Sequence, residues 1–308
     1  MPPFFSVIIT AYNYAHLIAE TIESALNQQF TDYEIIIVNN GSTDDTAHVL
    51  SRYSNSSSGR IIVIENQENR GEGGGRNRGI FAAQGKYLAF LDADDLWYPW
   101  TLQTYYDTIL KYDYPAILIA TGSEFYTRET VNAISKDKLQ VSAYDNFFSA
   151  AARRYIPAGT PGTVVNAEDA RRIGGLSEER VIGIDQEFFL KLGDVKGVVH
   201  VTSPVTAAIR RHGGNMQRNV PMAADGMLLF IKKECRGLYP GGPAYRWERR
   251  AIISRLARTI SLQSLRAQLF AQAWLIYRRT ILWHLRLGRI KYLVGFPFLY
   301  LYESMRSR

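Results

Sequence analysis

The sequence has only one cysteine, Cys235, among its 308 residues. A framework of intramolecular disulfides is therefore excluded, and a reducing compartment such as the cytoplasm is expected. The first residues, MPPFFSVIITAYN, contain neither the basic segment nor the small-residue cleavage site of a secretory signal. The histidines are few and do not repeat the spacing of zinc ligands. These absences exclude a disulfide-stabilised fold and give no indication of a zinc site.

Two common nucleotide-binding motifs are also missing. The glycine-rich stretch NRGEGGGRNRG cannot be aligned with G-x-G-x-x-G, the dinucleotide fingerprint. The segment GIFAAQGKY resembles a P-loop, but its spacing is one residue too long and Tyr87 replaces the required Ser or Thr. Ordinary dinucleotide sites and ATP-hydrolysing sites are therefore disfavoured.

Long hydrophobic runs are absent from the basic C-terminal part. Residues 244–308 carry 13 Lys and Arg against two acids, a net charge of +11, whereas the rest of the chain has a net charge of −4. The longest uncharged run there, YLVGFPFLYLY, has 11 residues and contains Pro297, so it is too short to span a bilayer. Cations mixed with aromatic and aliphatic residues are typical of helices that lie on a membrane surface.

We therefore expect residues 244–308 to contact a membrane surface, with interfacial aromatic residues at Trp283, Tyr292, Phe296 and Phe298. The alternative is a helical appendage that packs on the main body or on another subunit. Nucleic-acid binding is not expected, because no recognition motif accompanies the charge.

The first third of the chain has the pattern of an α/β domain. Apolar runs rich in Ile, Val, Tyr and Phe alternate with stretches of helical spacing, and the runs are too continuous for half-exposed strands. This pattern predicts a mostly parallel sheet covered on both faces. Beyond about residue 220 the pattern is helical. The predicted strands are 4–10, 33–39, 60–66 and 86–92; the predicted domains are 1–220 and 221–308.

Polar stretches follow each of the four predicted strands. They are TAYN (10–13), NNGSTDD (39–45), NQENRGEGGG (66–75) and DADD (92–95). Ligands of open α/β sheets bind beyond the carboxyl ends of the strands, so these stretches should meet at one rim. The third stretch supplies flexible backbone and, with the residues that follow it, arginines suited to a diphosphate.

Three carboxylates are crowded into the last of these stretches, at Asp92, Asp94 and Asp95. Capping of the helix that follows would account for one or two of them. A hard divalent cation such as Mg²⁺ or Mn²⁺, held together with diphosphate oxygens, would account for all three by offsetting their repulsion.

The order of these motifs closely resembles the family 2 glycosyltransferases of GT-A fold. The resemblance runs from SVIITAYN through VNNGSTDDT and NRGEGGGRNRG to LDADD, and resumes at GGLSEERVIGIDQEFFLKL and IRRHGGN. It covers roughly residues 4–215 and leaves the C-terminal part outside. It implies a nucleotide-diphospho-sugar donor, a UDP-sugar being favoured, and one inverting displacement at the anomeric carbon.

The resemblance also implies roles for individual residues. Thr10, Ala11 and Tyr12 would form the wall for the base and ribose, and Asn39 or Asn40 would face the base. Asp94, Asp95 and His212 are the candidate metal ligands, although a lone histidine is more often structural. The residues expected to bind the donor are Thr10, Ala11, Tyr12, Asn39, Asn40, Arg70, Arg76, Asp92, Asp94 and Arg211.

Asp185 corresponds to the catalytic base of the family; without the other motifs it would be read as a helix N-cap. Two positions depart from the family pattern. VNNGS replaces the commoner VDDGS, which leaves the choice of base open, and Ile184 stands where many members have a glutamate before the catalytic aspartate. The second change leaves the class of acceptor open.

The expected function is transfer of a sugar to the hydroxyl of a saccharide or lipid-linked acceptor, in polysaccharide or glycolipid assembly. It would take place in the cytoplasm or on the inner face of the membrane. One alternative is a protein that binds nucleotide-sugars without catalysis. Another is a sugar-phosphate nucleotidyltransferase, but that enzyme needs a glycine-rich basic loop after the first strand, and TAYNYAHL contains no glycine.

Overall fold

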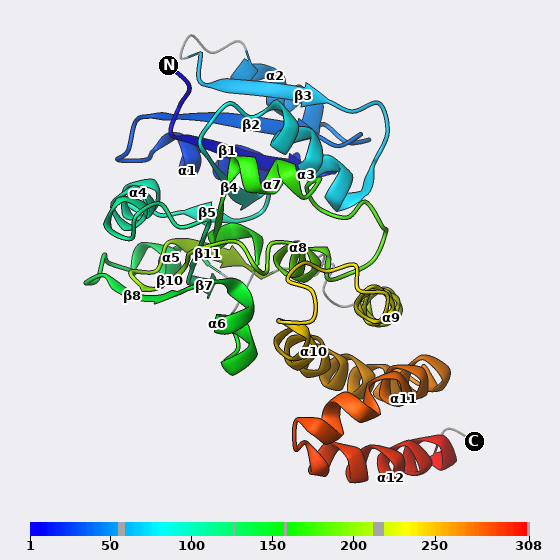
Figure 1. The fold of residues 1–308 in the computed structure, drawn as a ribbon. Helices are drawn as coiled ribbons and strands as arrows, with labels where there is room; N and C mark the ends of the chain where they lie inside the picture. Colours follow the sequence, from blue (N-terminus) through cyan, green and yellow to red (C-terminus); the bar gives the residue numbers. More distant parts are fainter. Residues whose placement is uncertain (55–58, 126, 157–158, 212–218, 307–308) are drawn as a thin grey trace. The chain divides into compact units, whose positions relative to one another are not determined.

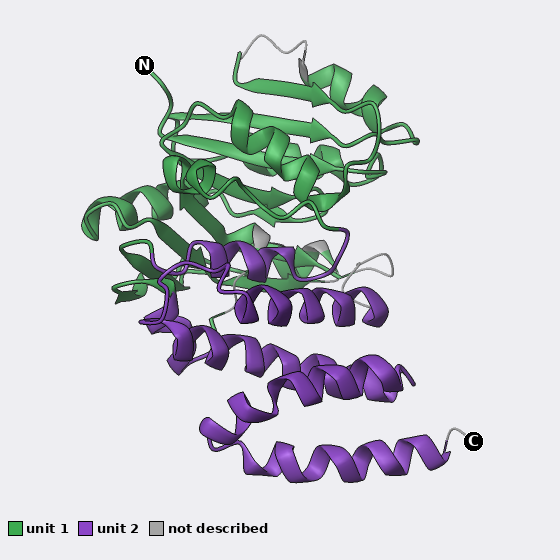
Figure 2. Cartoon of the chain, turned by 45° about the vertical axis from the view of Figure 1, so that its right-hand side comes forward, with its two compact units in different colours: residues 1–147, 156–179, 195–213 green, residues 148–155, 180–194, 214–308 purple. Residues whose placement is uncertain are grey.

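The computed structural model describes residues 1–54, 59–125, 127–156, 159–211 and 219–306. The chain forms two compact units (Figure 2). Unit 1 comprises residues 1–147, 156–179 and 195–213; unit 2 comprises residues 148–155, 180–194 and 214–308. The short segments 148–155 and 180–194 thus join the C-terminal helices, whereas the sequence pattern places the domain boundary at 220 alone.

Unit 1 is built on an eight-stranded sheet with the order β3-β2-β1-β4-β9-β6-β10-β8 (Figure 1). The first four strands in this order are parallel, and they match the apolar runs of the sequence. The side chains of β1, β2 and β4 are mostly buried because both faces of the sheet are covered, as the continuous apolar runs predict, whereas the edge strand β3 is only partly buried. These strands are β1 (Phe5–Ala11), β2 (Tyr33–Asn39), β3 (Ile61–Glu65) and β4 (Tyr87–Asp92).

Helices cover the two faces of this parallel part. The odd-numbered residues of β1 pack with apolar side chains of α1 (Ile18–Leu26), α2 (Thr46–Ser54) and α4 (Thr101–Lys111) in one core cluster. The opposite face is covered by α3 (Gly71–Ala82), which lies against Ile8, and by α7 (Ala167–Arg172), which packs on α3. The result is a three-layered α/β unit.

The rest of unit 1 contains antiparallel pairs. β9 is antiparallel to both β4 and β6, and β8 is antiparallel to β10. A small second sheet, in the order β5-β11-β7, pairs β11 with the strand that follows the DADD segment. The remaining elements are β5 (Leu96–Trp97), β6 (Ile117–Ala120), β7 (Gly122–Phe125), α5 (Arg128–Asn132), β8 (Gln140–Tyr144), η1 (Thr160–Gly162), β9 (Thr163–Asn166), β10 (Val198–Ser203) and β11 (Ala207–Arg210).

Unit 2 is helical. A buried ion pair joins two of its helices: the Nε atom of Arg249 lies 2.7 Å from an oxygen of Glu234, and both side chains are at most 3% exposed. Within the described residues, no helix has the length and apolar character needed to cross a membrane. The helices are most of α6 (Phe147–Arg153), then α8 (Ile184–Lys191), α9 (Val220–Cys235), α10 (Arg246–Arg266), α11 (Phe270–Arg286) and α12 (Ile290–Arg306).

The aromatic residues of the C-terminal helices do not all lie at the surface, where their sequence pattern predicts them. Trp283, Tyr292 and Phe296 are 5%, 7% and 1% exposed. Tyr292 and Phe296 belong to a core cluster of unit 2 and contact the ring of Tyr277. Only Phe298, 70% exposed, is available to a surface contact. The prediction of an interfacial position is therefore wrong for the three buried rings, because these rings hold the helices together.

Candidate active site

Four polar segments meet at one rim of the sheet in unit 1, as the sequence predicts. In the parallel register, Thr10 of β1 lies opposite Asp92 of β4, and Ala11 lies opposite Asn39 of β2. Asn39 in turn lies opposite Glu65 of β3. The carboxyl ends of these four strands therefore place the predicted donor-binding residues side by side.

The three aspartates after β4 lie in a largely buried environment. Asp94 and Asp95 are 8% and 3% exposed, whereas the side chain of Asp92 is 33% exposed. The hydroxyl of Tyr14 donates to Asp94 at 3.3 Å. Burial, together with the negative charges of Asp92 and Asp94, raises the pKa of Asp95 to about 9. Full ionisation of the three carboxylates is therefore disfavoured in the protein alone.

Arg210, at the end of β11, holds the loop that carries these aspartates. Its backbone N–H donates to Asp95 at 2.8 Å, and its Nε donates to the backbone oxygen of Asp94 at 2.9 Å. Its guanidinium also pairs with Glu20 of α1 at 2.6 Å. Arg210 is not among the residues predicted from the sequence, whereas its neighbour Arg211 is. Successive side chains of a strand point to opposite faces. The alternation in IRR therefore predicts that only one of the two arginines faces the loop, but it does not say which one.

The chemistry of this cluster fits a hard divalent cation. Its donors are carboxylate oxygens. Burial and the mutual repulsion of these carboxylates both raise the pKa of Asp95, and a bound cation would offset both effects. No three His, Cys, Asp or Glu side chains of the described part of the chain form a complete metal site. A cation bound here would therefore need ligands from elsewhere, such as diphosphate oxygens. His212, the third ligand proposed from the sequence, lies outside the described residues.

The predicted diphosphate-binding arginines differ in their surroundings. The side chain of Arg76 is only 5% exposed and pairs with Asp92 at 2.8 Å and with Glu72 at 2.7 Å. Arg70 is 45% exposed and lies 3.7 Å from Glu178. Arg211 pairs with Glu124, a largely exposed carboxylate. Arg70 is thus the most accessible of the three, and Arg76 balances the charges of Asp92 and Glu72.

The glycine run forms the first turns of α3, so the prediction of a flexible loop there is wrong. The helix begins at Gly71, and its glycines lie against neighbouring atoms. A Cβ at Gly75 would lie 2.5 Å from the Cγ2 of Thr10, and one at Gly79 would lie 2.6 Å from the Cγ2 of Ile8. These glycines serve close packing of the helix on β1. The helix N-terminus is therefore at the rim, beside the ends of β1 and β2.

The three residues predicted to form the base and ribose wall have different exposures. Ala11 is fully buried, and its side chain belongs to the core cluster that contains Ile18 and Ile22 of α1. Tyr12 is 41% exposed. The Oγ1 atom of Thr10 is buried and has no hydrogen-bond partner among the described residues. The wall itself stays a prediction.

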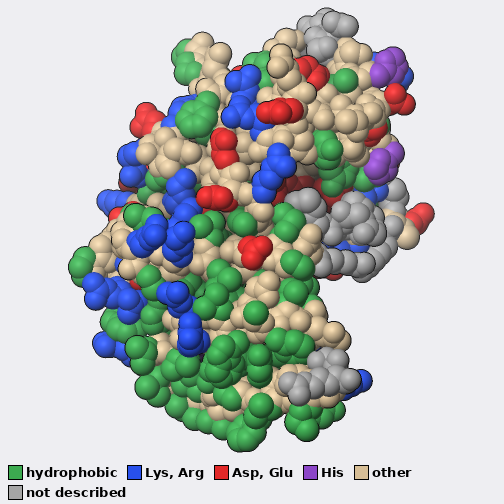
Figure 3. Space-filling model, turned by 90° about the vertical axis from the view of Figure 1, so that its right-hand side faces the viewer, with side chains coloured by type: hydrophobic (Ala, Val, Ile, Leu, Met, Phe, Trp, Pro, Cys, Tyr) green, Lys and Arg blue, Asp and Glu red, His purple; other side chains and the backbone are tan. Residues whose placement is uncertain are grey.

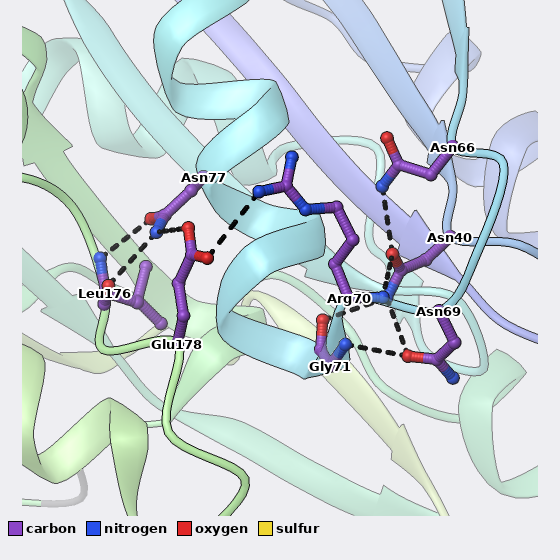
Figure 4. A network of polar contacts seen from close by, with 8 residues as sticks. All are labelled: Asn40, Asn66, Asn69, Arg70, Gly71, Asn77, Leu176 and Glu178. Carbon is purple, nitrogen blue, oxygen red and sulfur yellow. Dashed lines mark hydrogen bonds and ion pairs between the residues drawn. The ribbon is translucent and has the colours of Figure 1, made fainter.

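Asn40 organises the loop between β3 and α3 (Figure 4). Its Oδ1 accepts from the backbone N–H of Arg70 at 3.2 Å and from the amide of Asn66 at 2.9 Å. Its Nδ2 donates to the carbonyl of Gly71 at 2.9 Å and to the side chain of Asn69 at 3.3 Å. The two backbone partners fix the amide orientation, because one can only donate and the other can only accept. All four positions of this 2%-exposed amide are thus occupied within the protein.

Asn39 is held in a similar way. Its Nδ2 donates to Glu65 at 2.7 Å, and its Oδ1 accepts from the backbone N–H of Ser42 at 3.2 Å. An aspartate at position 39 would face the carboxylate of Glu65, and an aspartate at position 40 could not donate to Gly71. The amides of VNNGS therefore match their local partners, which gives the departure from VDDGS a structural reason. Contact of either residue with a nucleotide base stays a prediction.

Asp185 lies in unit 2, in the first turn of α8. The N-cap of this helix is Gly183, with φ of 104°, so Asp185 is not the cap. An acid in the first turn is favoured by the helix dipole, and the side chain is partly exposed. Ile184 is 3% exposed and belongs to the buried side of the helix. Burial explains an apolar residue there, and the role of Asp185 as base stays a prediction.

Sequence comparisons connect this arrangement with known proteins. Residues 6–154 match the family model described as Glycosyl transferase family 2. The chain is 46% identical over 92 residues to UDP-Glc:alpha-D-GlcNAc-diphosphoundecaprenol beta-1,3-glucosyltransferase WfaP of Escherichia coli, covering 30% of this chain and 36% of WfaP. It is 42% identical over 95 residues to the putative teichuronic acid biosynthesis glycosyltransferase TuaG of Bacillus subtilis, covering 31% and 37%. The matches span little more than a third of these relatives.

Solved structures show the same fold. Staphylococcus aureus TarS 1–349 in complex with UDP superposes with a TM-score of 0.65 at 19% identity, covering 85% of this chain and 72% of TarS. The mannosyltransferase PcManGT of Pyrobaculum calidifontis, in complex with GDP-Man and Mn²⁺, superposes with a TM-score of 0.53 at 16% identity, covering 98% and 88%. The fold and the rim define a glycosyltransferase of the GT-A class. Within this class, residues 6–154 form a glycosyltransferase family 2 domain.

Proposed function

We propose that this protein transfers a sugar, with inversion, from a UDP-sugar to an acceptor hydroxyl. The observation that carries the proposal is the cluster of Asp92, Asp94 and Asp95 at the end of β4, in register with the ends of β1 and β2. WfaP uses UDP-Glc according to its name, and TarS was solved with UDP, which supports a UDP-sugar as donor.

The cluster would hold the donor and a divalent cation. Asp94 and Asp95 would hold Mn²⁺ or Mg²⁺ together with diphosphate oxygens, with His212 as a further candidate ligand. The bound cation would stabilise negative charge on the departing nucleoside diphosphate. Tyr14 and Arg210 hold the loop in place, and Arg70 and Arg211 would add positive charge near the diphosphate.

The displacement itself needs one proton acceptor. The acceptor hydroxyl oxygen would form a bond to the anomeric carbon as the bond from that carbon to the diphosphate oxygen breaks. Asp185 would take the proton of the hydroxyl late in this step. The hydroxyl attacks from the side opposite the leaving diphosphate in one displacement, without a covalent intermediate on the protein, so the anomeric carbon is inverted.

The acceptor is proposed to be a saccharide or a lipid-linked saccharide. WfaP acts on a diphosphoundecaprenol-linked sugar and TuaG is associated with teichuronic acid, both by their names, so assembly of a polysaccharide or glycolipid is the favoured context. A lipid-linked acceptor would lie in the membrane. A cytoplasmic protein that binds the membrane surface through residues 244–308 would reach such an acceptor.

A panel of donors tests the proposal. UDP-glucose, UDP-N-acetylglucosamine and GDP-mannose would each be added with Mn²⁺, and we would record the thermal midpoint and the release of nucleoside diphosphate in the presence of a bacterial lipid extract. We expect a UDP-sugar to raise the midpoint and to be consumed. The Asp95→Asn variant should lose both effects, whereas Asp107→Asn, an exposed acid on α4, should keep them.

Two results would change the assignment. Binding of a UDP-sugar without any consumption, with every acceptor fraction tried, would favour the non-catalytic binding protein. A preference for GDP-mannose would support a glycosyltransferase whose donor carries guanine and not uracil. The amides at positions 39 and 40 leave the choice of base open.

A further inference from the structure

Helix α12 exposes an unusually apolar side. Phe298, Tyr302 and Met305 are 70%, 60% and 75% exposed, and they are accompanied by three more exposed aliphatic residues. A few isolated apolar side chains are normal on a protein surface, but a contiguous group of this kind marks a contact site. The group, called here the α12 face, consists of Ile290, Val294, Phe298, Leu301, Tyr302 and Met305.

The six residues lie on one side of the helix. At 100° per residue, their side chains fall within an arc of about 120°. The buried Tyr292 and Phe296 point to the opposite side, toward Tyr277 of α11. Leu282 and Leu285, near the end of α11, are a further 74% and 56% exposed. The α12 face is thus a continuous apolar strip on the exposed side of the helix, opposite the side that packs in the core of unit 2.

Positive charge accompanies this strip. Residues 270–306 contain six Lys and Arg and a single acid, Glu303. Arg278, Arg279, Lys291 and Arg306 are exposed. Figure 3 shows hydrophobic side chains gathered over the C-terminal helices, with Lys and Arg side chains at the margin of the apolar area.

We propose that the α12 face lies on the surface of an anionic lipid bilayer. Its aliphatic and aromatic side chains enter the boundary between headgroups and acyl chains, while the neighbouring cations contact anionic headgroups. A second copy of the chain fits less well, because a two-fold contact through this face would bring its positive margin close to the same margin of the partner. A bilayer of anionic lipids offers apolar depth and opposite charge together.

This proposal extends the membrane location given above and specifies the residues that carry it. Phe298 and its neighbours on α12 insert, whereas Trp283, Tyr292 and Phe296 remain buried in unit 2. The binding does not depend on sugar transfer, so it can be measured whether or not the donor and acceptor have been identified.

Flotation of the full chain with vesicles tests the α12 face. Vesicles of phosphatidylglycerol and phosphatidylcholine would be compared with vesicles of phosphatidylcholine alone, at low and high salt. We expect binding to the anionic vesicles that high salt weakens only in part. The double variant Val294→Ser, Phe298→Ser should lower the partition coefficient at least about tenfold. Phe81→Ser, on α3, removes an equally large exposed ring (57% exposed) and should leave binding unchanged.

A second pair of substitutions tests the charge. Arg278→Gln with Arg279→Gln should weaken binding at low salt by about 30-fold and reduce its salt dependence. Far-UV circular dichroism and the thermal midpoint verify that each variant is folded, and UDP binding by the variants separates this proposal from the proposed function.

Three outcomes would overturn the proposal. One is absence of binding to anionic vesicles at low salt, and another is equal binding by the Val294→Ser, Phe298→Ser variant. The third is a stable dimer in sedimentation that this variant alone converts to a monomer, because the α12 face would then be a subunit interface.

Discussion

Substitution of Asn40 by aspartate tests whether the amide organises the rim. The aspartate has nearly the same shape, and its oxygen can still accept from the backbone of Arg70. It cannot donate to the carbonyl of Gly71 or to the side chain of Asn69, which the amide contacts at 2.9 and 3.3 Å. At neutral pH the variant therefore places a buried negative charge against two oxygen acceptors.

The cost can be estimated from these contacts. Two hydrogen bonds are lost, each worth about 1 kcal/mol, and the oxygens that remain are poorly satisfied at a further cost of about 1–3 kcal/mol. Uptake of a proton limits the total, because keeping an aspartic acid neutral at pH 7 costs about 4 kcal/mol. We expect the free energy of unfolding to fall by about 3–4 kcal/mol at pH 7.

The penalty should depend on pH in a defined direction. Burial raises the pKa of the introduced aspartate in the folded state above its unfolded value, so the destabilisation is largest above the folded pKa and shrinks as pH falls toward about 4. Urea unfolding followed by circular dichroism at pH 7 and pH 5 measures it.

Asn13→Asp is the matched control. The Nδ2 of Asn13 donates to the hydroxyl of Thr43, and a hydroxyl can reverse its role and donate to a carboxylate. The backbone at Asn13, with φ of 61°, is one that aspartate also adopts. A loss below about 0.5 kcal/mol for Asn40→Asp, or a loss equal to that of the control, would refute the role given to Asn40.

Three further substitutions have defined expectations. Asp185→Asn should keep UDP-sugar binding but lower turnover by about 10²–10⁴-fold, because an amide cannot take the proton; wild-type turnover would assign the base elsewhere. Arg210→Gln should weaken UDP binding in Mn²⁺ about tenfold in calorimetry by freeing the Asp94–Asp95 loop, while Arg172→Gln, a surface pair with Asp169, should not. Burial lowers the pKa of His284 to about 4 from 6.5, so its unfolded form gains a proton first and stability falls as pH drops from about 6.5 to 4. His284→Phe should remove up to about 3 kcal/mol of this pH dependence in urea unfolding; an unchanged slope would contradict it.

The four parallel strands could be predicted from the sequence because three of them, β1, β2 and β4, are buried on both faces. In a run such as YEIIIVN, apolar side chains point to both faces of the strand. A strand buries both of its faces when it lies inside a parallel sheet that is covered by helices on both sides, so the composition of the run indicates this position. The convergence of TAYN, NNGSTDD and DADD follows from the same geometry, because parallel strands end at one edge.

Other features depended on contacts that sequence spacing does not reveal. The glycines after Arg70 suggested a flexible loop, but they form a helix because Ile8 and Thr10 leave no room for a Cβ. Arg210 was missed in favour of Arg211 because the choice depends on which side of β11 faces the DADD loop.

The aromatic residues of the tail show the same limit. Composition indicated that Tyr292, Phe296 and Phe298 share an environment, but their positions around α12 place two of them in the core and one in solvent. Their helical spacing shows that Phe298 lies on a different side of α12 from Tyr292 and Phe296. Which of these sides is buried depends on the packing of α11 against α12, and the sequence alone does not reveal that packing.

Calorimetric titration of UDP, with Mn²⁺ and then with EDTA, tests most directly whether the DADD cluster is a donor site that works with a cation. We predict that UDP binds at least about tenfold more tightly with Mn²⁺, and that Asp94→Asn and Asp95→Asn remove this difference. Equal affinity in Mn²⁺ and EDTA, or an undiminished effect of Mn²⁺ in both variants, would contradict the role assigned to the cluster.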